Sequence, residues 1–206
     1  VKAAMAAGVK LIAYTSLLHA DSSPMALALE HRETEEVIRA SGLPFTLLRN
    51  GWYSENYAMG VAAAVQHGVV LGAAGTGPLS LAARRDFAEA AAVVLADDGA
   101  RHAGKVYELA GDEAYTLGGF AAEIARQSGK PVHYQDMPQA EYQTALVSMG
   151  LPEGFAELLA ECDAKAAMGA LYEPGKALSQ LIGRPTTPLR ETVATALAAQ
   201  RLLRPS

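Results

Sequence analysis

Two short, almost wholly apolar runs constrain the fold of this chain more than any other feature of its sequence. The first covers residues 9–15 (VKLIAYT) and the second covers residues 45–48 (FTLL). Runs of this length with turn residues beside them are typical of strands that are buried on both faces of a parallel sheet. We therefore expect the core of the fold to be a buried parallel sheet.

A helical pattern lies between the two runs. Ser23 and Pro24 supply a helix N-cap and a first-turn proline, residues 25–41 follow as an amphipathic helix, and Gly42 suits the left-handed residue after it. Residues 2–8 have the pattern of the tail of an earlier helix. The chain is thus expected to begin in the middle of a fold.

The same alternation continues through the second half of the chain. Asp86 and Glu89 are spaced as a capping pair for a helix over residues 87–96, and Thr116 is expected to cap a helix that ends near Gly129. A helical stretch is expected near residues 57–66, and extended segments are expected at residues 69–71, 106–109 and 131–135.

Strands that alternate with helices predict an α/β fold with a Rossmann-like, doubly wound parallel sheet. We expect a single domain over residues 1–206, in which the amino-terminal part of the sheet is absent. Residues 131–180 are expected to add a smaller, mostly helical carboxy-terminal lobe.

Charge and cysteine content narrow the class of function. The formal net charge is −5 and no run of Lys or Arg occurs, which argues against nucleic acid or an anionic membrane as a partner, because both require concentrated positive charge. No apolar stretch reaches the ~20 residues of a membrane-spanning helix, and no residue spacing indicates a metal site. Cys162 is the only cysteine, so an internal disulfide is impossible and a cytoplasmic location is expected. A small molecule is the expected ligand.

The loops after the first two strands are expected to carry the binding site, because ligands of an open parallel sheet bind beyond the carboxyl ends of its strands. These loops cover residues 15–23 and 50–56. The second loop (NGWYSEN) gathers two aromatic residues and several hydrogen-bonding groups, which is typical of a surface that contacts a ligand. The alternative is that its aromatic residues form a structural plug.

Six segments of the sequence agree with one known family. They are residues 11–20 (LIAYTSLLHA), 30–35 (EHRETE), 45–56 (FTLLRNGWYSEN), 72–77 (GAAGTG), 105–111 (KVYELAG) and 181–187 (LIGRPTT). In this order and without large gaps, they closely resemble the type-2 NAD(P)H:quinone oxidoreductases, which are NmrA-like, atypical short-chain dehydrogenases.

The Gly-rich turn with which that family holds the cofactor pyrophosphate has no counterpart in this sequence. Gly72, Gly75 and Gly77 lie in a short turn without a following helix, so we interpret them as turn glycines. The resemblance therefore begins after the first third of the family's domain, and weak cofactor binding is expected of this polypeptide alone.

The resemblance implies NADPH, or alternatively NADH, as the cofactor, and a lobe that closes over the substrate. The residues it assigns to the cofactor are Asn50, Gly51, Trp52, Tyr53, Ser54, Glu55, Arg84 and His31. Two of them also have a plainer interpretation. Arg84 would then be half of a solvated pair with Arg85, and His31 would be an ordinary, partly buried histidine.

Ser16, Tyr53 and His19 are the candidates for the reaction itself. Ser16 stands where similar dehydrogenases place a hydroxyl near the substrate carbonyl. Tyr53 and Tyr57 would stack on a planar acceptor, and His19 would hydrogen-bond one of its oxygens. The alternatives are a core position for Tyr57 and a solvated loop position for His19.

The proton-donating Tyr-x-x-x-Lys pair of short-chain dehydrogenases is replaced here by Leu27 and His31. Hydride addition to a simple ketone builds a strongly basic alkoxide, for which a positioned acid contributes about 10² to 10⁴ in rate. Addition to a quinone leaves a phenolate-like oxygen whose conjugate acid has a pKa of about 10, so a hydrogen bond or a water is enough. The replacement therefore favours a quinone-like electrophile as substrate.

Three other interpretations are open at this point. The same pocket would suit other conjugated electrophiles, such as triphenylmethane dyes. Some NmrA-like proteins are understood to bind a dinucleotide without turnover and to act as redox sensors. Finally, a gene fragment with an exposed strand edge would associate with a second copy, so a homodimer is expected.

Overall fold

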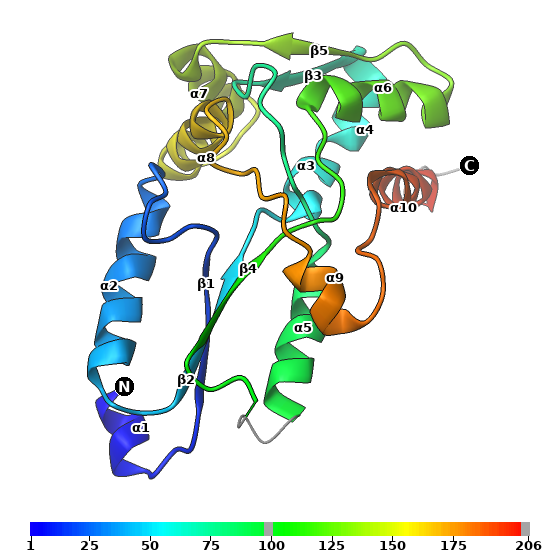
Figure 1. The fold of residues 1–206 in the computed structure, drawn as a ribbon. Helices are drawn as coiled ribbons and strands as arrows, with labels where there is room; N and C mark the ends of the chain where they lie inside the picture. Colours follow the sequence, from blue (N-terminus) through cyan, green and yellow to red (C-terminus); the bar gives the residue numbers. More distant parts are fainter. Residues whose placement is uncertain (97–100, 203–206) are drawn as a thin grey trace.

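Three parallel strands form the main sheet of the computed structural model, which describes residues 1–96 and 101–202. In spatial order they are β1 (Ile12–Leu17), β2 (Phe45–Asn50) and β4 (Lys105–Leu109) (Figure 1). The register pairs Leu17 with Asn50 and Asn50 with Leu109, so all three strands end in one row. The carboxyl edge of the sheet is therefore even.

Helices cover both faces of this sheet, which confirms the doubly wound architecture. They are α2 (Leu27–Ala40) on one face, and α5 (Arg84–Ala96) with α9 (Ala177–Ile182) on the other. Leu48 and Leu109 pack against Phe87 of α5 and Leu178 of α9. On the opposite face, Tyr14 of β1 bonds His31 of α2.

A second, smaller parallel sheet lies at the opposite end of the molecule from the amino terminus (Figure 1). It pairs β3 (Val69–Gly72) with β5 (His133–Asp136). Val61, Phe120 and Val193 share one apolar core behind it. The helices of this region are α4 (Val61–His67), α6 (Leu117–Ser128), α7 (Gln139–Ser148), α8 (Glu153–Ala166) and α10 (Leu189–Leu202).

The start of the chain differs in detail from the sequence prediction. Residues 9–15 were expected to be a strand, but the N–H of Val9 donates to the carbonyl of Ala4 and so closes the end of α1 (Lys2–Ala6). The sheet begins three residues later, where the N–H of Ile12 donates to the carbonyl of Pro44. A residue used to end a helix cannot pair in the sheet.

The start of α2 also differs from the prediction. The helix begins at Leu27, and the Ser23 hydroxyl accepts a long, 3.4 Å hydrogen bond from the N–H of Met25 in the preceding turn. Ser23 therefore belongs to the turn and is not the N-cap. At the other end of the helix, Gly42 has φ +72°, the left-handed conformation expected of it.

The predicted helix over residues 57–66 is divided into α3 (Ser54–Ala58) and α4. Gly60 separates the two as the N-cap of α4, consistent with the low helix propensity of glycine. The helix expected after Thr116 is confirmed, because the Thr116 hydroxyl accepts a hydrogen bond from the N–H of Gly119 and Gly129 is left-handed.

The capping pair expected of Asp86 and Glu89 is wrong. Asp86 is the third residue of α5 and is completely buried. Its carboxylate accepts hydrogen bonds from the N–H and hydroxyl of Thr187 at 2.7 and 3.0 Å, and from the Arg184 guanidinium at 2.8 Å. A buried carboxylate needs donors, and a segment about a hundred residues away in sequence supplies them.

Replacing Asp86 is therefore expected to destabilise the fold. In Asp86→Ala the Thr187 amide and Arg184 lose their acceptor, and we expect the free energy of unfolding to fall by about 2–4 kcal/mol. Chemical denaturation measures this loss. Glu89→Ala is the matched control, because Glu89 also binds Arg184 but its side chain is 42% exposed. Equal losses in both variants would contradict the importance of the buried carboxylate.

Candidate functional site

Three polar residues form one row near the carboxyl edge of the main sheet. The register places Ser16 beside Arg49 and Arg49 beside Glu108. Residues paired side by side in a sheet point to the same face, and here that face is covered by α2. Arg49 reaches Glu35 of α2 with two hydrogen bonds, from Nε at 2.9 Å and from a terminal nitrogen at 2.7 Å.

Arg49 is the centre of a network in which one guanidinium binds three carboxylates. Its remaining nitrogen lies 2.8 Å from Glu108 and 3.0 Å from Asp21 in the β1–α2 loop. The Arg49 side chain is 5% exposed. Burial raises the pKa of Glu35, but hydrogen bonds from Arg49 and Ser16 outweigh it, and the pKa of Glu35 is lowered. The pair is therefore charged at neutral pH.

The structure places Ser16 and His19 differently with respect to solvent. Ser16 is buried, and its hydroxyl donates to Glu35 at 2.6 Å. His19 lies in the loop beyond β1, with its side chain 31% exposed. The N–H of His19 donates to Glu108 at 2.8 Å, and its ring nitrogen Nε2 lies 3.4 Å from Glu173. His19 is thus the more accessible of the two.

Asn50, the last residue of β2, has an unused hydrogen-bonding atom. The residue is 6% exposed, and its Oδ1 atom has no hydrogen-bond partner among the described residues. Neighbours in a strand point to opposite faces, so Asn50 and Arg49 occupy the two faces of the sheet. A buried polar atom without a partner is costly, so Asn50 stays a candidate for contact with a ligand.

The loop expected over residues 50–56 is shorter than predicted, because Asn50 belongs to β2 and Ser54 begins α3. Gly51 follows the strand so closely that an added Cβ would lie 3.0 Å from the carbonyl oxygen of Leu109. Trp52 packs against the apolar core that contains Met25. The loop is therefore built partly as the structural plug that was the alternative interpretation.

Tyr53, Glu55 and Arg84 are brought together. Arg84 is the first residue of α5, and its backbone N–H donates a hydrogen bond to both carboxylate oxygens of Glu55, at 3.0 and 3.1 Å. The Arg84 guanidinium lies over the Tyr53 ring, 4.7 Å from its centroid, and this ring also packs against Phe87. Ser54 is buried beside them, 3.4 Å from the hydroxyl of Thr192.

Two candidates lie apart from this group. Nδ1 of His31 is 2.8 Å from the Tyr14 hydroxyl, and burial lowers the pKa of His31. The Tyr57 hydroxyl donates to Asp163 of α8 at 2.6 Å, and burial raises the pKa of Tyr57. The Tyr57 hydroxyl and one of the two His31 ring nitrogens are therefore used inside the fold.

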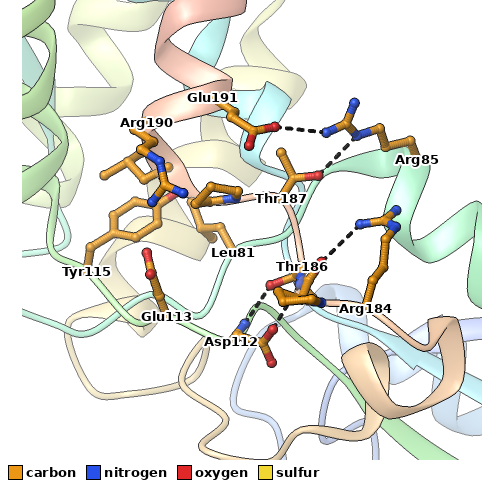
Figure 2. Close-up of a pocket in the computed structure, with 13 residues that line it drawn as sticks. Leu81, Arg85, Asp112, Glu113, Tyr115, Arg184, Thr186, Thr187, Arg190 and Glu191 are labelled. Atoms are coloured by element: carbon orange, nitrogen blue, oxygen red, sulfur yellow. Dashed lines mark hydrogen bonds and ion pairs between the residues drawn. The ribbon is translucent and has the colours of Figure 1, made fainter.

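Two cavities of the described residues lie away from His19 and Asn50. Figure 2 shows one of about 340 Å³ beneath the segment 184–191. Two of its acidic side chains already have partners: Glu191 binds Arg85, and Asp112 accepts a hydrogen bond from the amide of Thr186. A larger cavity of about 580 Å³ lies between α3, α4 and α10 and is bordered by Glu55. Neither cavity is lined by His19 or Asn50.

Other types of site find little support within residues 1–96 and 101–202. No group of three or more His, Cys, Asp or Glu side chains there could hold a metal ion, and no helix there is long and apolar enough to cross a membrane. Cys162 is buried, and burial raises the pKa of its thiol to about 12, so it is a poor nucleophile.

The residues that sequence reasoning missed are the members of the Arg49 network. Asp21, Glu35, Arg49 and Glu108 were not named as site residues, although Arg49 directly follows the apolar run of β2. A charge on a strand expected to be buried requires partners. That requirement was the available signal.

Known proteins resemble nearly the whole chain. The model of the NmrA-like family matches residues 1–195. Quinone oxidoreductase 2 of Escherichia coli (strain K12) is 56% identical over 194 residues, which are 94% of this chain and 67% of that protein. This chain thus spans about two thirds of that relative's length.

Solved structures agree with this relationship. The crystal structure of an NADPH-dependent quinone oxidoreductase from Escherichia coli matches with a TM-score of 0.93 over 95% of this chain and 70% of that one. Triphenylmethane reductase from Citrobacter sp. matches with a TM-score of 0.90 at 37% identity, over 96% of this chain and 68% of that one. With a family model that covers nearly the whole chain and a relative at 56% identity, the chain belongs to the NmrA-like family.

Proposed function

We propose that this protein is an NADPH-dependent oxidoreductase that reduces a quinone. The observation that carries the proposal is Asn50, whose buried, unpartnered Oδ1 lies at the carboxyl edge of the sheet, where ligands of such folds bind. The Escherichia coli quinone oxidoreductase, 56% identical to this chain, has also been crystallised with NADPH.

The residues at this edge fit a nicotinamide nucleotide. Oδ1 of Asn50 accepts hydrogen bonds, and a carboxamide N–H or a ribose hydroxyl would supply one. Gly51, Trp52, Ser54 and Glu55 follow it, and Arg84 adds a positive charge. His31 lies apart from these residues on α2, and its Nε2 atom would bind a ribose hydroxyl, because Nδ1 is already paired with Tyr14. When bound, NADPH supplies the hydride, and NADH would supply the same chemistry.

The acceptor side is assigned to His19, Ser16 and Tyr53. The partly exposed His19 ring would hydrogen-bond the quinone oxygen on which negative charge develops, and Tyr53 would offer an aromatic surface to the ring. Ser16 holds the end of β1 through Glu35. The reduced quinone takes its second hydrogen as a proton from His19 or from water, because a phenolate-like oxygen needs no stronger acid.

A triphenylmethane dye is the second candidate acceptor, because the Citrobacter reductase of such dyes has a closely similar fold at 37% identity. We also propose that residues 131–180, which contain β5, α7 and α8, close over the acceptor. A cytoplasmic location and a homodimer complete the proposal. They are supported by the lone cysteine and by β1 pairing on one side only among the described residues.

The proposal predicts quinone-dependent oxidation of NADPH. The protein, prepared as its gene encodes it, is titrated with NADPH while nicotinamide fluorescence is followed, and menadione is then added. We expect saturable binding and then oxidation that accelerates with menadione. Binding without oxidation would instead indicate a redox sensor, and no binding would contradict the proposed cofactor.

Asn50 is predicted to contribute directly to cofactor affinity. Asn50→Ala removes an acceptor that has no partner among the described residues, so the fold should keep its stability while the Kd for NADPH rises about tenfold. Fluorescence titration gives the Kd, and thermal unfolding checks the fold. Asn56→Ala is the control, because Asn56 has the same side chain but lies inside α3. Equal Kd values for Asn50→Ala and the unmodified protein would remove Asn50 from the site.

A further inference from the structure

We infer that Arg49 is a positioning residue for the acceptor side of the site, because it holds in place the β1–α2 loop that carries His19. The inference rests on the proposed function. It goes beyond that function by naming a residue that touches neither cofactor nor substrate and yet sets the geometry of the reaction.

Arg49 is unable to contact a ligand directly. Its side chain is 5% exposed, and each of its three nitrogens already has a carboxylate partner. Nε and one terminal nitrogen bind the two oxygens of Glu35, and the other terminal nitrogen binds Glu108 and Asp21. Any effect of Arg49 on a reaction must therefore pass through these partners.

Two of the partners lead to the loop after β1. Asp21 is itself a loop residue, 3.0 Å from Arg49. Glu108 uses one oxygen for Arg49 at 2.8 Å and the other for the backbone N–H of His19 at 2.8 Å. The guanidinium thus fixes the loop at two points, one of which is the residue that faces the acceptor.

The backbone of His19 needs this support. Its φ of +54° is the only positive value among the non-glycine residues of the described ranges, and such a conformation is costly for a side chain with a Cβ. It persists where surrounding contacts determine it. The hydrogen bond from the N–H of His19 to Glu108 is such a contact, and Glu108 is in turn oriented by Arg49.

Glu35 anchors the network to the scaffold. It lies on α2, is 5% exposed, and binds Arg49 through both oxygens. A planar guanidinium can donate two parallel hydrogen bonds to Glu35 and still bind Glu108 and Asp21 with its third nitrogen. A lysine ammonium presents only a single point of charge. Arg49→Lys should therefore keep the buried positive charge while losing some of the hydrogen bonds that hold the β1–α2 loop.

The test compares Arg49→Lys with the unmodified protein as its gene encodes it. We expect kcat for menadione to fall roughly 10- to 100-fold, because small misplacements of a catalytic group have effects of this size, with the Kd for NADPH unchanged. Hydrogen exchange of the His19 amide should become faster. Arg126→Lys is the matched control, because Arg126 forms an exposed ion pair with Glu123, and its kcat should not change.

A double-mutant cycle separates positioning from general destabilisation. His19→Asn removes the imidazole but tolerates the left-handed backbone. If Arg49 acts through His19, Arg49→Lys lowers kcat much less in the His19→Asn background than in the unmodified protein. Equal reductions in both backgrounds would overturn the inference. If Arg49→Lys does not fold, Glu108→Gln takes its place, since Glu108 is 27% exposed.

Failure of the inference can be distinguished from failure of the proposed function. If the unmodified protein oxidises NADPH with menadione and Arg49→Lys keeps its kcat, the inference is wrong and the function stands. If the unmodified protein shows no such oxidation, the function is wrong and the inference is overturned with it.

Discussion

The ion pairs of the buried Arg49 guanidinium are the interactions on which the structure at the carboxyl edge of the main sheet depends. They connect β2 to α2 through Glu35, to β4 through Glu108 and to the β1–α2 loop through Asp21. A buried charge is tolerated only with close partners, and removing one partner of such a pair typically costs about 3–5 kcal/mol. The lowered pKa of Glu35 has a matching consequence. Its contribution to stability is present above the ordinary value of 4.5 and is lost as the pH falls through the lowered value.

Two other carboxylates hold the segment between α9 and α10. Asp86 binds Thr187, and Asp112 binds the amide of Thr186 at 2.8 Å. Side chains from two segments thus hold consecutive peptide groups of a third. From that segment the chain enters α10, which packs against the core behind the second sheet. The charged pairs therefore determine the path that brings the last helix back to the amino-terminal half.

Local patterns predicted the elements better than they predicted the contacts. The apolar runs identified the parallel strands because a strand that is buried on both faces consists almost entirely of apolar residues. The start of β1 was misplaced because Val9 ends a helix, a role that depends on its bond to Ala4. Asp86 has the spacing of a cap, and only the fold reveals Thr187 as its partner.

In the candidate site, too, the sequence pattern indicated individual residues better than it indicated the contacts between them. The sequence around Trp52 and Tyr53 indicated a ligand-binding loop because aromatic and polar residues gather there, and this role stays a prediction. Arg49 was visible as a charge after an apolar run, but identifying Glu35 and Glu108 requires the register of the sheet and the facing of α2. Ion-pair partners so far apart in sequence can be identified only when the sheet register and the face covered by α2 are known.

The left-handed backbone of His19 limits how this site can change by mutation. At φ +54° a β-branched or bulky replacement is strained, while glycine, asparagine and aspartate are accommodated. Those three side chains are smaller than imidazole, and none of them has its ability to gain and lose a proton near neutral pH. Variation in acceptor preference within this scaffold would thus arise more readily at neighbouring positions than at residue 19. The positive φ angle at residue 19, more than the chemistry of its side chain, limits which residues can occupy this position.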